Sequence, residues 1–429
     1  MRRRQLFLFV LLLLVSLRLP AAAVEPRPVI GRGPPLRSLF EVFAMALDVY
    51  LTNACNLRCK YCFNLDREDA PRVPVDDICA ILKAAYEKQN RYVSITGGEP
   101  FLYKPIFEVL DYAHDLGYWI NVLSHGGLLD QPKIDRLKKY WRLRIRISLD
   151  GPDRETHDLL RGEGTFDNTM AKVDLLVENG INVGLGVTVS ETNLGAVEEI
   201  LRLAIEKRVA FIRFVPVARV KKGKAAHVTA SLHERLLESL VTLTLKYREA
   251  IDLAQGEAAA TPASIDLLTT RRCMAGKNFF GITPDKKIVP CPLIADHPDV
   301  PSVHFEDALS FAELGRQMDA LFAGMKERLG GICGTCEFRA VCYGGCLAEK
   351  ISFDRPLDAE QPVCTKLILE RIGGRFDPAD MDRIVRSWVH QLQGSLEASK
   401  SHACMRQAPY WNLNFRVYDR WSETAMRFS

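Results

Sequence analysis

The sequence lacks strong net charge, internal repeats and long apolar segments. Residues 1–44 hold seven arginines and two glutamates, so with a net charge of +4 for the whole chain the remainder is close to neutral. A nucleic-acid surface needs a basic stripe, and the near-neutral remainder favours none. No internal repeat and no low-complexity tract occurs, which excludes solenoids and repeat arrays.

The N-terminal segment has a pattern typical of a signal peptide. Three arginines at positions 2–4 precede an apolar run at 6–17, followed by a proline and three alanines. The run is shorter than the roughly 20 residues that a membrane-spanning helix needs. Met45 opens a domain that looks complete, and export conflicts with the cysteine chemistry described below. We therefore expect residues 1–44 to be a dispensable leader or a start assigned too far upstream, and the protein to be cytoplasmic without membrane association.

Strand and helix patterns alternate from Met45 onward. Short β-rich runs are each followed by an amphipathic helical pattern. The predicted strands are 45–51, 92–96, 118–123, 143–149, 181–189 and 211–215. The predicted helices are 75–89, 104–116, 131–139, 166–178, 194–207 and 232–254. Such alternation implies an α/β fold with a parallel sheet.

Twelve cysteines carry most of the functional information. Cys55, Cys59 and Cys62 form a Cys-x3-Cys-x2-Cys motif directly after the first predicted strand, at the strand end where barrel folds build their sites. Three thiolates can hold three irons of a 4Fe-4S cluster and leave the fourth iron open for a ligand. Disulfides and zinc are the alternatives. The chain is long enough to fold on its core alone, and this group has three cysteines where a zinc ribbon needs four.

A second motif follows the second predicted strand, in the turn Gly97-Gly98-Glu99-Pro100. Two glycines let the backbone approach closely, and a carbonyl or carboxylate can accept a hydrogen bond from an ammonium group. Together the two motifs resemble those of the radical S-adenosylmethionine (SAM) superfamily. The resemblance implies that the three cysteines hold the catalytic 4Fe-4S cluster, that this turn binds the amino group of SAM, and that Tyr61 lies beside the adenine. It also implies a partial (β/α)6 barrel of the TIM type.

Further resemblances fall at the ends of later strands. Ser148 and Asp150 end the fourth strand, where relatives use this serine and its surroundings near the ribose; hydroxyl and carboxylate groups suit a diol. Arg161 corresponds to an arginine that lies near the carboxylate of SAM in relatives with auxiliary clusters. Turn capping is the alternative role for Asp150, and a surface position is the alternative for Arg161. His125 follows the third strand and could contact cofactor or substrate, or be solvated.

Seven cysteines near the C-terminus form a second pattern. A Cys-x2-Cys-x5-Cys-x3-Cys core with two preceding cysteines and one trailing cysteine resembles the SPASM domain of many peptide-modifying radical enzymes. The resemblance implies one auxiliary cluster held by Cys273, Cys291 and Cys346, and a second held by Cys333, Cys336, Cys342 and Cys364. The sequence departs from the SPASM pattern at Lys286, five residues before Cys291, where relatives usually have glycine. Cys79 and Cys404 are predicted to be structural.

The predicted domains follow from these patterns. They are the leader 1–44, the barrel 45–217, a last helix and bridge 218–270, the SPASM-like domain 271–370 and a tail 371–429. The tail has helical character at 381–392 and then an aromatic-rich stretch, which we interpret as a packing element, with a substrate-docking strand as the alternative.

The resemblance implies an oxidoreductase-type reaction. A reduced cluster cleaves SAM to a 5′-deoxyadenosyl radical, which abstracts a substrate hydrogen. The leading substrate is a peptide or protein side chain, with a flavodoxin- or ferredoxin-type electron donor. A tetrapyrrole or other small molecule is the alternative. Sulfatase-type maturation is disfavoured, because Pro292 stands where those relatives carry an aspartate base. An electron-transfer or scaffold protein is the non-enzyme alternative, against which the intact motifs argue.

Overall fold

The computed structural model describes residues 46–62, 72–220, 229–247, 273, 275–277, 279–336, 338–382 and 384–385. All of them belong to one compact unit, Pro34–Ser429. The leader, Cys404 and the aromatic stretch of the tail lie outside the described residues. Within the described part, no helix is long and apolar enough to cross a membrane.

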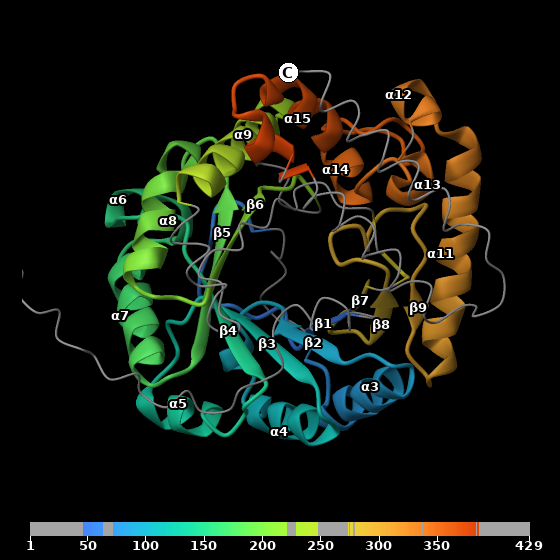
Figure 1. Cartoon of the computed structure of the whole chain (residues 1–429). Coiled ribbons are helices and arrows are strands. Elements are labelled where there is room, and N and C mark those ends of the chain that lie inside the picture. The colour runs from blue at the N-terminus through green and yellow to red at the C-terminus, as the bar shows by residue number, and fades with distance from the viewer. Residues whose placement is uncertain are drawn as a thin grey trace, which may run out of the picture. The chain divides into compact units, whose positions relative to one another are not determined.

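Six parallel strands form the main part of the sheet (Figure 1). They are β1 (Ala46–Tyr50), β2 (Tyr92–Thr96), β3 (Trp119–Ser124), β4 (Leu143–Ser148), β5 (Asn182–Val189) and β6 (Phe211–Pro216). They lie side by side in the order of the chain, each parallel to its neighbour. The parallel sheet and all six predicted strands are confirmed, with ends that differ by one residue at most.

Helices connect the strands and lie on one side of the sheet (Figure 1). They are α3 (Val75–Glu87), α4 (Ile106–Leu116), α5 (Gln131–Leu137), α6 (Arg154–Arg161), α7 (Thr165–Glu178), α8 (Val197–Glu206) and α9 (Ala230–Lys246). The sequence predicts all of these except α6. Local signals set their ends: Asp130 accepts a hydrogen bond from the Lys133 amide at the start of α5, and Gly117 ends α4 in a left-handed conformation.

The core lies between the strands and these helices. Side chains alternate along a strand, and the apolar set faces the helices. Leu47 and Val49 of β1 and Val93 and Ile95 of β2 are fully buried in this way. Burying such a side chain contributes about 1.5–3 kcal/mol. The alternate residues therefore face the opposite side of the sheet, which we call the inner face.

The C-terminal segment extends the same sheet. β7 (Phe279–Ile282) pairs in parallel with β1, and β8 (Lys287–Val289) and β9 (Val303–His304) follow as antiparallel strands. The helices of this segment are α11 (Leu309–Arg328), α12 (Gly331–Thr335), α13 (Arg339–Cys342), α14 (Leu347–Ser352) and α15 (Thr365–Gly373). Because β7 pairs with β1, the segment before Cys291 lies beside the strand that leads into the first cysteine motif.

The turn between β7 and β8 contains Lys286, the residue that replaces the glycine usual in relatives. Lys286 has a φ of 62°, a left-handed conformation. The turn is closed by hydrogen bonds from the Lys286 amide to the Thr283 carbonyl and from the Thr283 amide to the Lys287 carbonyl, both 3.0 Å long. The turn thus forms without the glycine, at a cost for a non-glycine residue of about 1–2 kcal/mol.

This strain leads to a stability prediction. We expect Lys286→Gly to be more stable than Lys286→Ala by about 1 kcal/mol, because only glycine relieves the left-handed conformation. Both variants lose the same partly exposed ion pair, Lys286 Nζ to Asp77 Oδ2 at 3.3 Å, so it cancels in the comparison. Urea unfolding monitored by circular dichroism measures the difference. Equal midpoints would show that the turn is not strained.

Candidate active site

The first cysteine motif forms the loop that follows β1. Cys55, Cys59 and Cys62 form no disulfide, and each is partly accessible. The Cys62 amide donates to the Cys59 carbonyl at 3.2 Å, and the Lys60 amide donates to the Leu160 carbonyl of α6 at 3.0 Å. The three thiols are therefore held in one loop, whose backbone is tied to a neighbouring helix.

The Gly-Gly-Glu-Pro turn lies directly against this loop. The Gly98 amide donates to the Thr52 carbonyl at 2.7 Å, and the Glu99 amide donates to the Ala54 carbonyl at 2.8 Å. A Cβ on Gly97 would lie 2.3 Å from the Thr52 oxygen, and one on Gly98 would lie 2.0 Å from the Ala54 oxygen. Only glycine permits this approach, so the two sequence motifs form one structural unit.

Glu99 fixes the turn rather than projecting from it. The side chain is fully buried. Its carboxylate accepts hydrogen bonds from the Phe101 amide at 3.1 Å, the Ser124 hydroxyl at 2.8 Å and the His125 amide at 3.0 Å. The carboxylate is therefore engaged by donors of the same chain.

His125 connects the cysteine loop to this turn. Its Nε2 lies 2.9 Å from Asn56 Oδ1 and 3.2 Å from Glu99 Oε2, and its Nδ1 accepts from the Gly127 amide at 2.9 Å. Burial lowers the pKa of His125. These contacts assign a neutral ring with its proton on Nε2. His125 is thus a buried bridge between the two motifs, and the solvated alternative is wrong.

Asp150 is the centre of a second buried group. It is fully buried, and its carboxylate binds the Tyr61 hydroxyl, Arg161 Nε and, at 2.7 Å, the Thr188 amide. Arg161 is only 8% exposed, which excludes the surface alternative. Its Nη1 lies 3.9 Å from Cys59 Sγ. Burial would lower the pKa of Arg161, but Asp150, Tyr61 and Cys59 hold it above its usual value. A permanent cation therefore lies beside the cysteine loop.

The remaining predicted cofactor residue, Ser148, ends β4 with a partly exposed side chain. It occupies the same set of alternate positions as Arg144 and Arg146, so it belongs to the inner face. Apart from Arg161 in α6, the predicted SAM contacts thus lie at the ends of β1, β2 and β4 or in the loops that follow them, which is where a barrel assembles its site.

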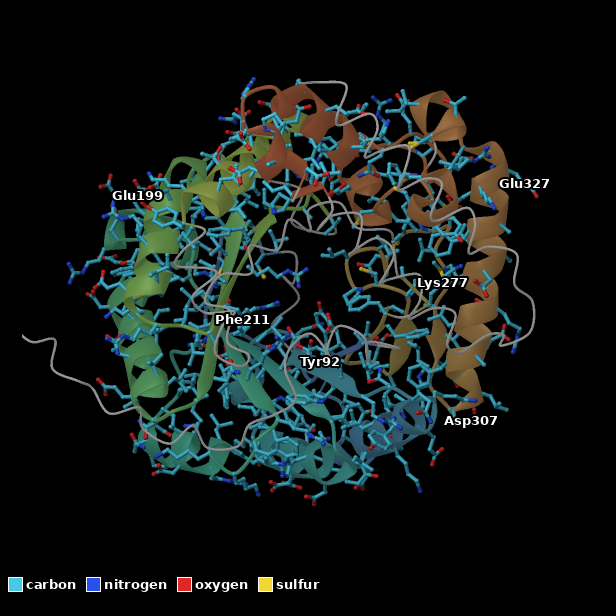
Figure 2. The ribbon with its side chains drawn as sticks, viewed as in Figure 1. Tyr92, Glu199, Phe211, Lys277, Asp307 and Glu327 are labelled. Atoms are coloured by element: carbon cyan, nitrogen blue, oxygen red, sulfur yellow. The ribbon has the colours of Figure 1, made fainter. Side chains whose placement is uncertain are left out.

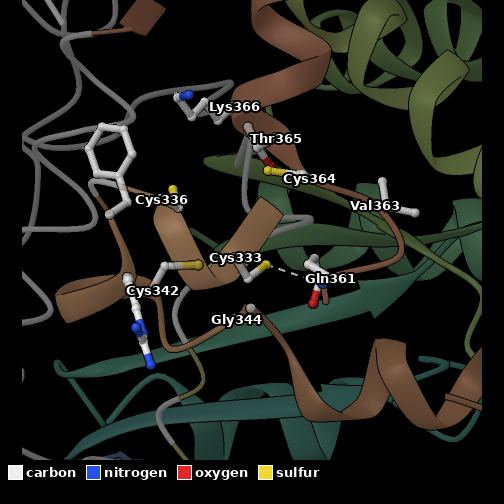
Figure 3. Close-up of a pocket in the computed structure, with 12 residues that line it drawn as sticks. Cys333, Cys336, Cys342, Gly344, Gln361, Val363, Cys364, Thr365 and Lys366 are labelled. Carbon is white, nitrogen blue, oxygen red and sulfur yellow. Dashed lines mark hydrogen bonds between the residues drawn. The ribbon is translucent and has the colours of Figure 1, made fainter. Parts of the chain in front are cut away.

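The C-terminal cysteines gather in two sets. Cys333, Cys336, Cys342 and Cys364 line one pocket together with Gly344 and Gly345 (Figure 3). Burial raises the pKa of Cys342 to about 12, and the other three cysteines of the pocket raise it too. Both glycines have a positive φ, 77° and 82°, which permits the close turn beside the pocket.

The second set consists of Cys273, Cys291 and Cys346. Burial raises the pKa of Cys346 well above its usual value, and Cys273 and Cys291 contribute through their proximity. The seven cysteines thus lie in two groups, and their division between two auxiliary clusters stays a prediction. None of the eleven cysteines in the described ranges forms a disulfide, and no group of three or more Cys, His, Asp or Glu residues in those ranges is arranged to hold a single metal ion.

The sequence comparison decides the family. Residues 49–204, which contain the cysteine loop, the Gly-Gly-Glu-Pro turn and the Asp150 group, match the profile of the Radical SAM superfamily. Residues 49–204 form a radical SAM domain. This family implies a 4Fe-4S cluster and SAM as cofactors, and three cysteines without disulfides beside a fixed cation suit an anionic iron–sulfur cluster.

Similar proteins of this superfamily cover most of the chain. An "AdoMet-dependent heme synthase" of Nitratidesulfovibrio vulgaris is 28% identical over 343 residues, which is 73% of this chain and 90% of the relative. The "Mycofactocin maturase MftC" of Mycobacterium tuberculosis is 27% identical over 362 residues, 80% of this chain and 88% of the relative. Among solved structures, Streptococcus suis SuiB bound to precursor peptide SuiA has a TM-score of 0.59 at 20% identity and covers 74% of each chain. This last match concerns the fold alone.

Several residues of this radical SAM site were missed from the sequence. Asn193 Nδ2 donates to the carbonyls of Asp150 at 2.8 Å and Thr188 at 2.9 Å. The Asp150 amide donates to His157 Nδ1 at 3.2 Å. His157 comes from α6, a helix that the sequence pattern does not predict. Asp153 accepts from the Thr156 amide at the start of α6, and this capping signal could have revealed the helix.

Lys350 was also missed, because a lysine in a short helix carries no sequence signal. It is fully buried in α14, and its Nζ donates to the Leu357 carbonyl at 2.8 Å. Burial lowers the pKa of Lys350, whereas Cys333, Cys342 and Cys273 favour its charged form. The ammonium group therefore lies near cysteines of both C-terminal sets.

Proposed function

We propose that this radical SAM enzyme cleaves SAM reductively and abstracts a hydrogen atom from a side chain of a peptide or protein substrate. The observation that carries the proposal is the direct contact between the cysteine loop and the Gly-Gly-Glu-Pro turn, which brings three thiols and a predicted SAM-binding turn together. When bound, the cluster supplies the electron that converts SAM into methionine and a 5′-deoxyadenosyl radical.

In this proposal the chain's own residues bind and orient the cofactor. Cys55, Cys59 and Cys62 hold the cluster and leave one iron for SAM. Because the Glu99 carboxylate is buried and engaged, the ammonium of SAM meets backbone carbonyls of the turn. Tyr61 and Ser148 contact the adenosine part. Asp150 holds Tyr61 and Arg161 in place.

The C-terminal cysteines hold auxiliary clusters in the proposal. The pocket of Figure 3 takes one 4Fe-4S cluster, and Cys273, Cys291 and Cys346 take a second. The division into a barrel at 45–217 and an auxiliary-cluster domain at 271–370 belongs to the same proposal. A cytoplasmic protein of the flavodoxin or ferredoxin type is the proposed electron donor.

Two relatives indicate two substrate classes. The mycofactocin maturase supports a peptide substrate together with a further relative, the "PqqA peptide cyclase" of Rhizobium meliloti. The haem synthase supports a tetrapyrrole as the second candidate, because its identity to this chain, 28%, is comparable with the 27% of the mycofactocin maturase. Both reactions begin with the same cleavage of SAM, so that step is tested first.

The test uses full-length protein reconstituted with iron and sulfide without oxygen. We expect about twelve irons per chain, four per cluster, and formation of 5′-deoxyadenosine with dithionite and SAM. Cys59→Ala should lose this product and about four irons, because one cluster loses a ligand. Cys79→Ala is the matched control, since Cys79 lies in α3 outside all three sets, and it should keep both. Full iron content without 5′-deoxyadenosine in the wild type would contradict the proposal.

A further inference from the structure

A buried lysine lies directly behind the wall of the pocket shown in Figure 3. Lys350 of α14 is fully buried, although its side chain ends in an ammonium group. A Cβ on Gly344 would lie 3.0 Å from Lys350 Nζ, and Gly344 is one of the residues that line the pocket. The ammonium group therefore lies against the backbone of the pocket wall.

A single hydrogen bond holds the ammonium group in this position. Lys350 Nζ donates to the Leu357 carbonyl at 2.8 Å. An ammonium group has three donors, so this contact fixes its place without using its full capacity. Asp358 also favours the charged form of Lys350, but its carboxylate is engaged by Arg328 Nε at 2.7 Å. The side chain is thus fixed beside the pocket by a neutral acceptor.

The cysteines of the pocket are the main groups that favour a charged Lys350. Burial lowers the pKa of this lysine, and Cys333 and Cys342 are the strongest of the groups that oppose the shift, ahead of Cys273 and Asp358. Both Cys333 and Cys342 line the pocket. The charge of the lysine and any negative charge in the pocket therefore stabilise each other.

A hydroxyl group in the pocket wall points to the same kind of occupant. Thr365 lines the pocket and is 2% exposed, and in the described part of the chain its hydroxyl has no hydrogen-bond partner. Figure 3 shows it beside Cys364, the preceding residue, at the start of α15. Buried hydroxyls are rarely left without a partner, and the sulfurs of an iron–sulfur cluster accept hydrogen bonds. The unpartnered hydroxyl therefore fits a cluster held by the four cysteines.

Backbone amides add further donors to the sulfurs of this pocket. The Gln361 amide donates to Cys333 Sγ at 3.4 Å, a bond drawn in Figure 3. Burial raises the pKa of Cys364, and the amides of Leu367 and Lys366 at the start of α15 oppose this rise. The amides, the hydroxyl and the ammonium group all favour negative charge in the pocket.

This arrangement has a direct consequence for electron affinity. Reduction of a 4Fe-4S cluster by one electron adds one negative charge. A nearby cation and hydrogen bonds to the sulfurs stabilise the reduced form more than the oxidised form, and they raise the reduction potential. Because Lys350 is fully buried, solvent ions screen its charge only weakly.

We propose that Lys350, supported by the Thr365 hydroxyl, raises the reduction potential of the 4Fe-4S cluster in the pocket of Figure 3. The inference rests on the proposed function, because it takes the four cysteines of the pocket to hold a cluster. Lys350 is a positioning residue that ligates no iron. It acts through its charge, whereas Thr365 acts through one hydrogen bond and contributes less.

The reduction potential is measured by redox titration of reconstituted full-length protein, followed by electron paramagnetic resonance. Cys59→Ala is the background for every variant, because it is expected to lose the catalytic cluster and to keep the auxiliary ones. The signal that Cys336→Ala removes from this background belongs to the pocket cluster. We expect Lys350→Met to lower the equilibrium constant for one-electron reduction of this cluster at least tenfold, which is a fall in potential of 59 mV or more.

Lys326→Met is the matched control. Lys326 is an exposed lysine in the last turn of α11, and Figure 2 labels the next residue, Glu327, on the outer side of this helix. Solvent screens a charge at this position, so the potential should equal that of the background.

Two further variants test the inference if Lys350→Met fails to fold. Lys350→Gln keeps a donor for the Leu357 carbonyl but has no charge, so it should show a fall similar to that of Lys350→Met. Thr365→Val keeps the shape of the side chain and removes only the hydroxyl, so it should show a smaller fall in the same direction.

An unchanged potential in cluster-loaded Lys350→Met or Lys350→Gln would overturn the inference, and so would an equal fall in Lys326→Met. That failure is distinct from failure of the proposed function. The latter is seen in protein with native Lys350, as the absence of 5′-deoxyadenosine from the wild type or of any signal that depends on Cys336.

Discussion

Replacing Gly98 by alanine should reduce 5′-deoxyadenosine formation at least about 100-fold while leaving the fold intact. The new Cβ would lie 2.0 Å from the Ala54 oxygen and 2.5 Å from its carbonyl carbon, which are backbone atoms that no rotamer change can move. Relief requires the cysteine loop to shift by roughly 1 Å, and a displacement of that size costs about 100-fold in rate. The hydrogen bond from the Gly98 amide to Thr52 weakens as well.

Gly195→Ala is the matched control for this change. Nothing lies within 4 Å of a Cβ at Gly195, and its backbone is not left-handed. We expect this variant to keep the rate of the wild type. Iron content and circular dichroism are measured on both variants, so that loss of the cluster is separated from misplacement of a retained one. A Gly98→Ala enzyme with full rate would show that the loop does not depend on contact with the turn.

The parts of the fold that the sequence predicts are those with a regular period. The alternation in β4, from Leu143 to Ser148, and the helical pattern of α3 are strong local signals. Parallel strands in chain order bring their carboxyl ends to one edge, so the contact between the cysteine loop after β1 and the turn after β2 follows from the pattern. Because the two motifs follow adjacent strands, their contact can be predicted without any further information about the tertiary fold.

The strands of the C-terminal segment could not be predicted in the same way. β7, β8 and β9 have four, three and two residues, too few to show a period. The partner of β7 is β1, which lies more than 200 residues earlier in the chain. Pairing over such a separation depends on the tertiary fold and leaves no local pattern.

The role of Asp150 was only half predicted for a similar reason. Its position after β4 suggests a cofactor contact or a turn cap, and both are local interpretations. Its actual partners are Tyr61, 89 residues earlier, and Thr188, 38 residues later. Likewise the sequence shows that Arg144 and Arg146 alternate with apolar residues along β4. That Arg146 lies near Arg213 of β6 follows only from the tertiary fold.

Asp150→Ala should lower the free energy of unfolding by about 3–5 kcal/mol. The substitution leaves the Arg161 guanidinium, 8% exposed, without its carboxylate, and an uncompensated buried charge carries a penalty of this size. The Thr188 amide and the Tyr61 hydroxyl lose the same acceptor. A loss of this size is a large part of the roughly 5–15 kcal/mol that stabilises a typical domain. Urea unfolding with circular dichroism as the signal measures it.

Asp167→Ala removes the carboxylate of another aspartate–arginine pair and is the control. Asp167 and its partner Arg154 are 58% and 73% exposed, so we expect a loss below about 1 kcal/mol. In the double variant Asp150→Ala/Arg161→Met the buried charge is gone, so its destabilisation should be smaller than the sum of the two single effects. Equal losses for Asp150→Ala and Asp167→Ala would mean that water reaches Arg161. In that case Arg161 would not be a fixed cation beside Cys59, and its proposed role at the cluster would have to be abandoned.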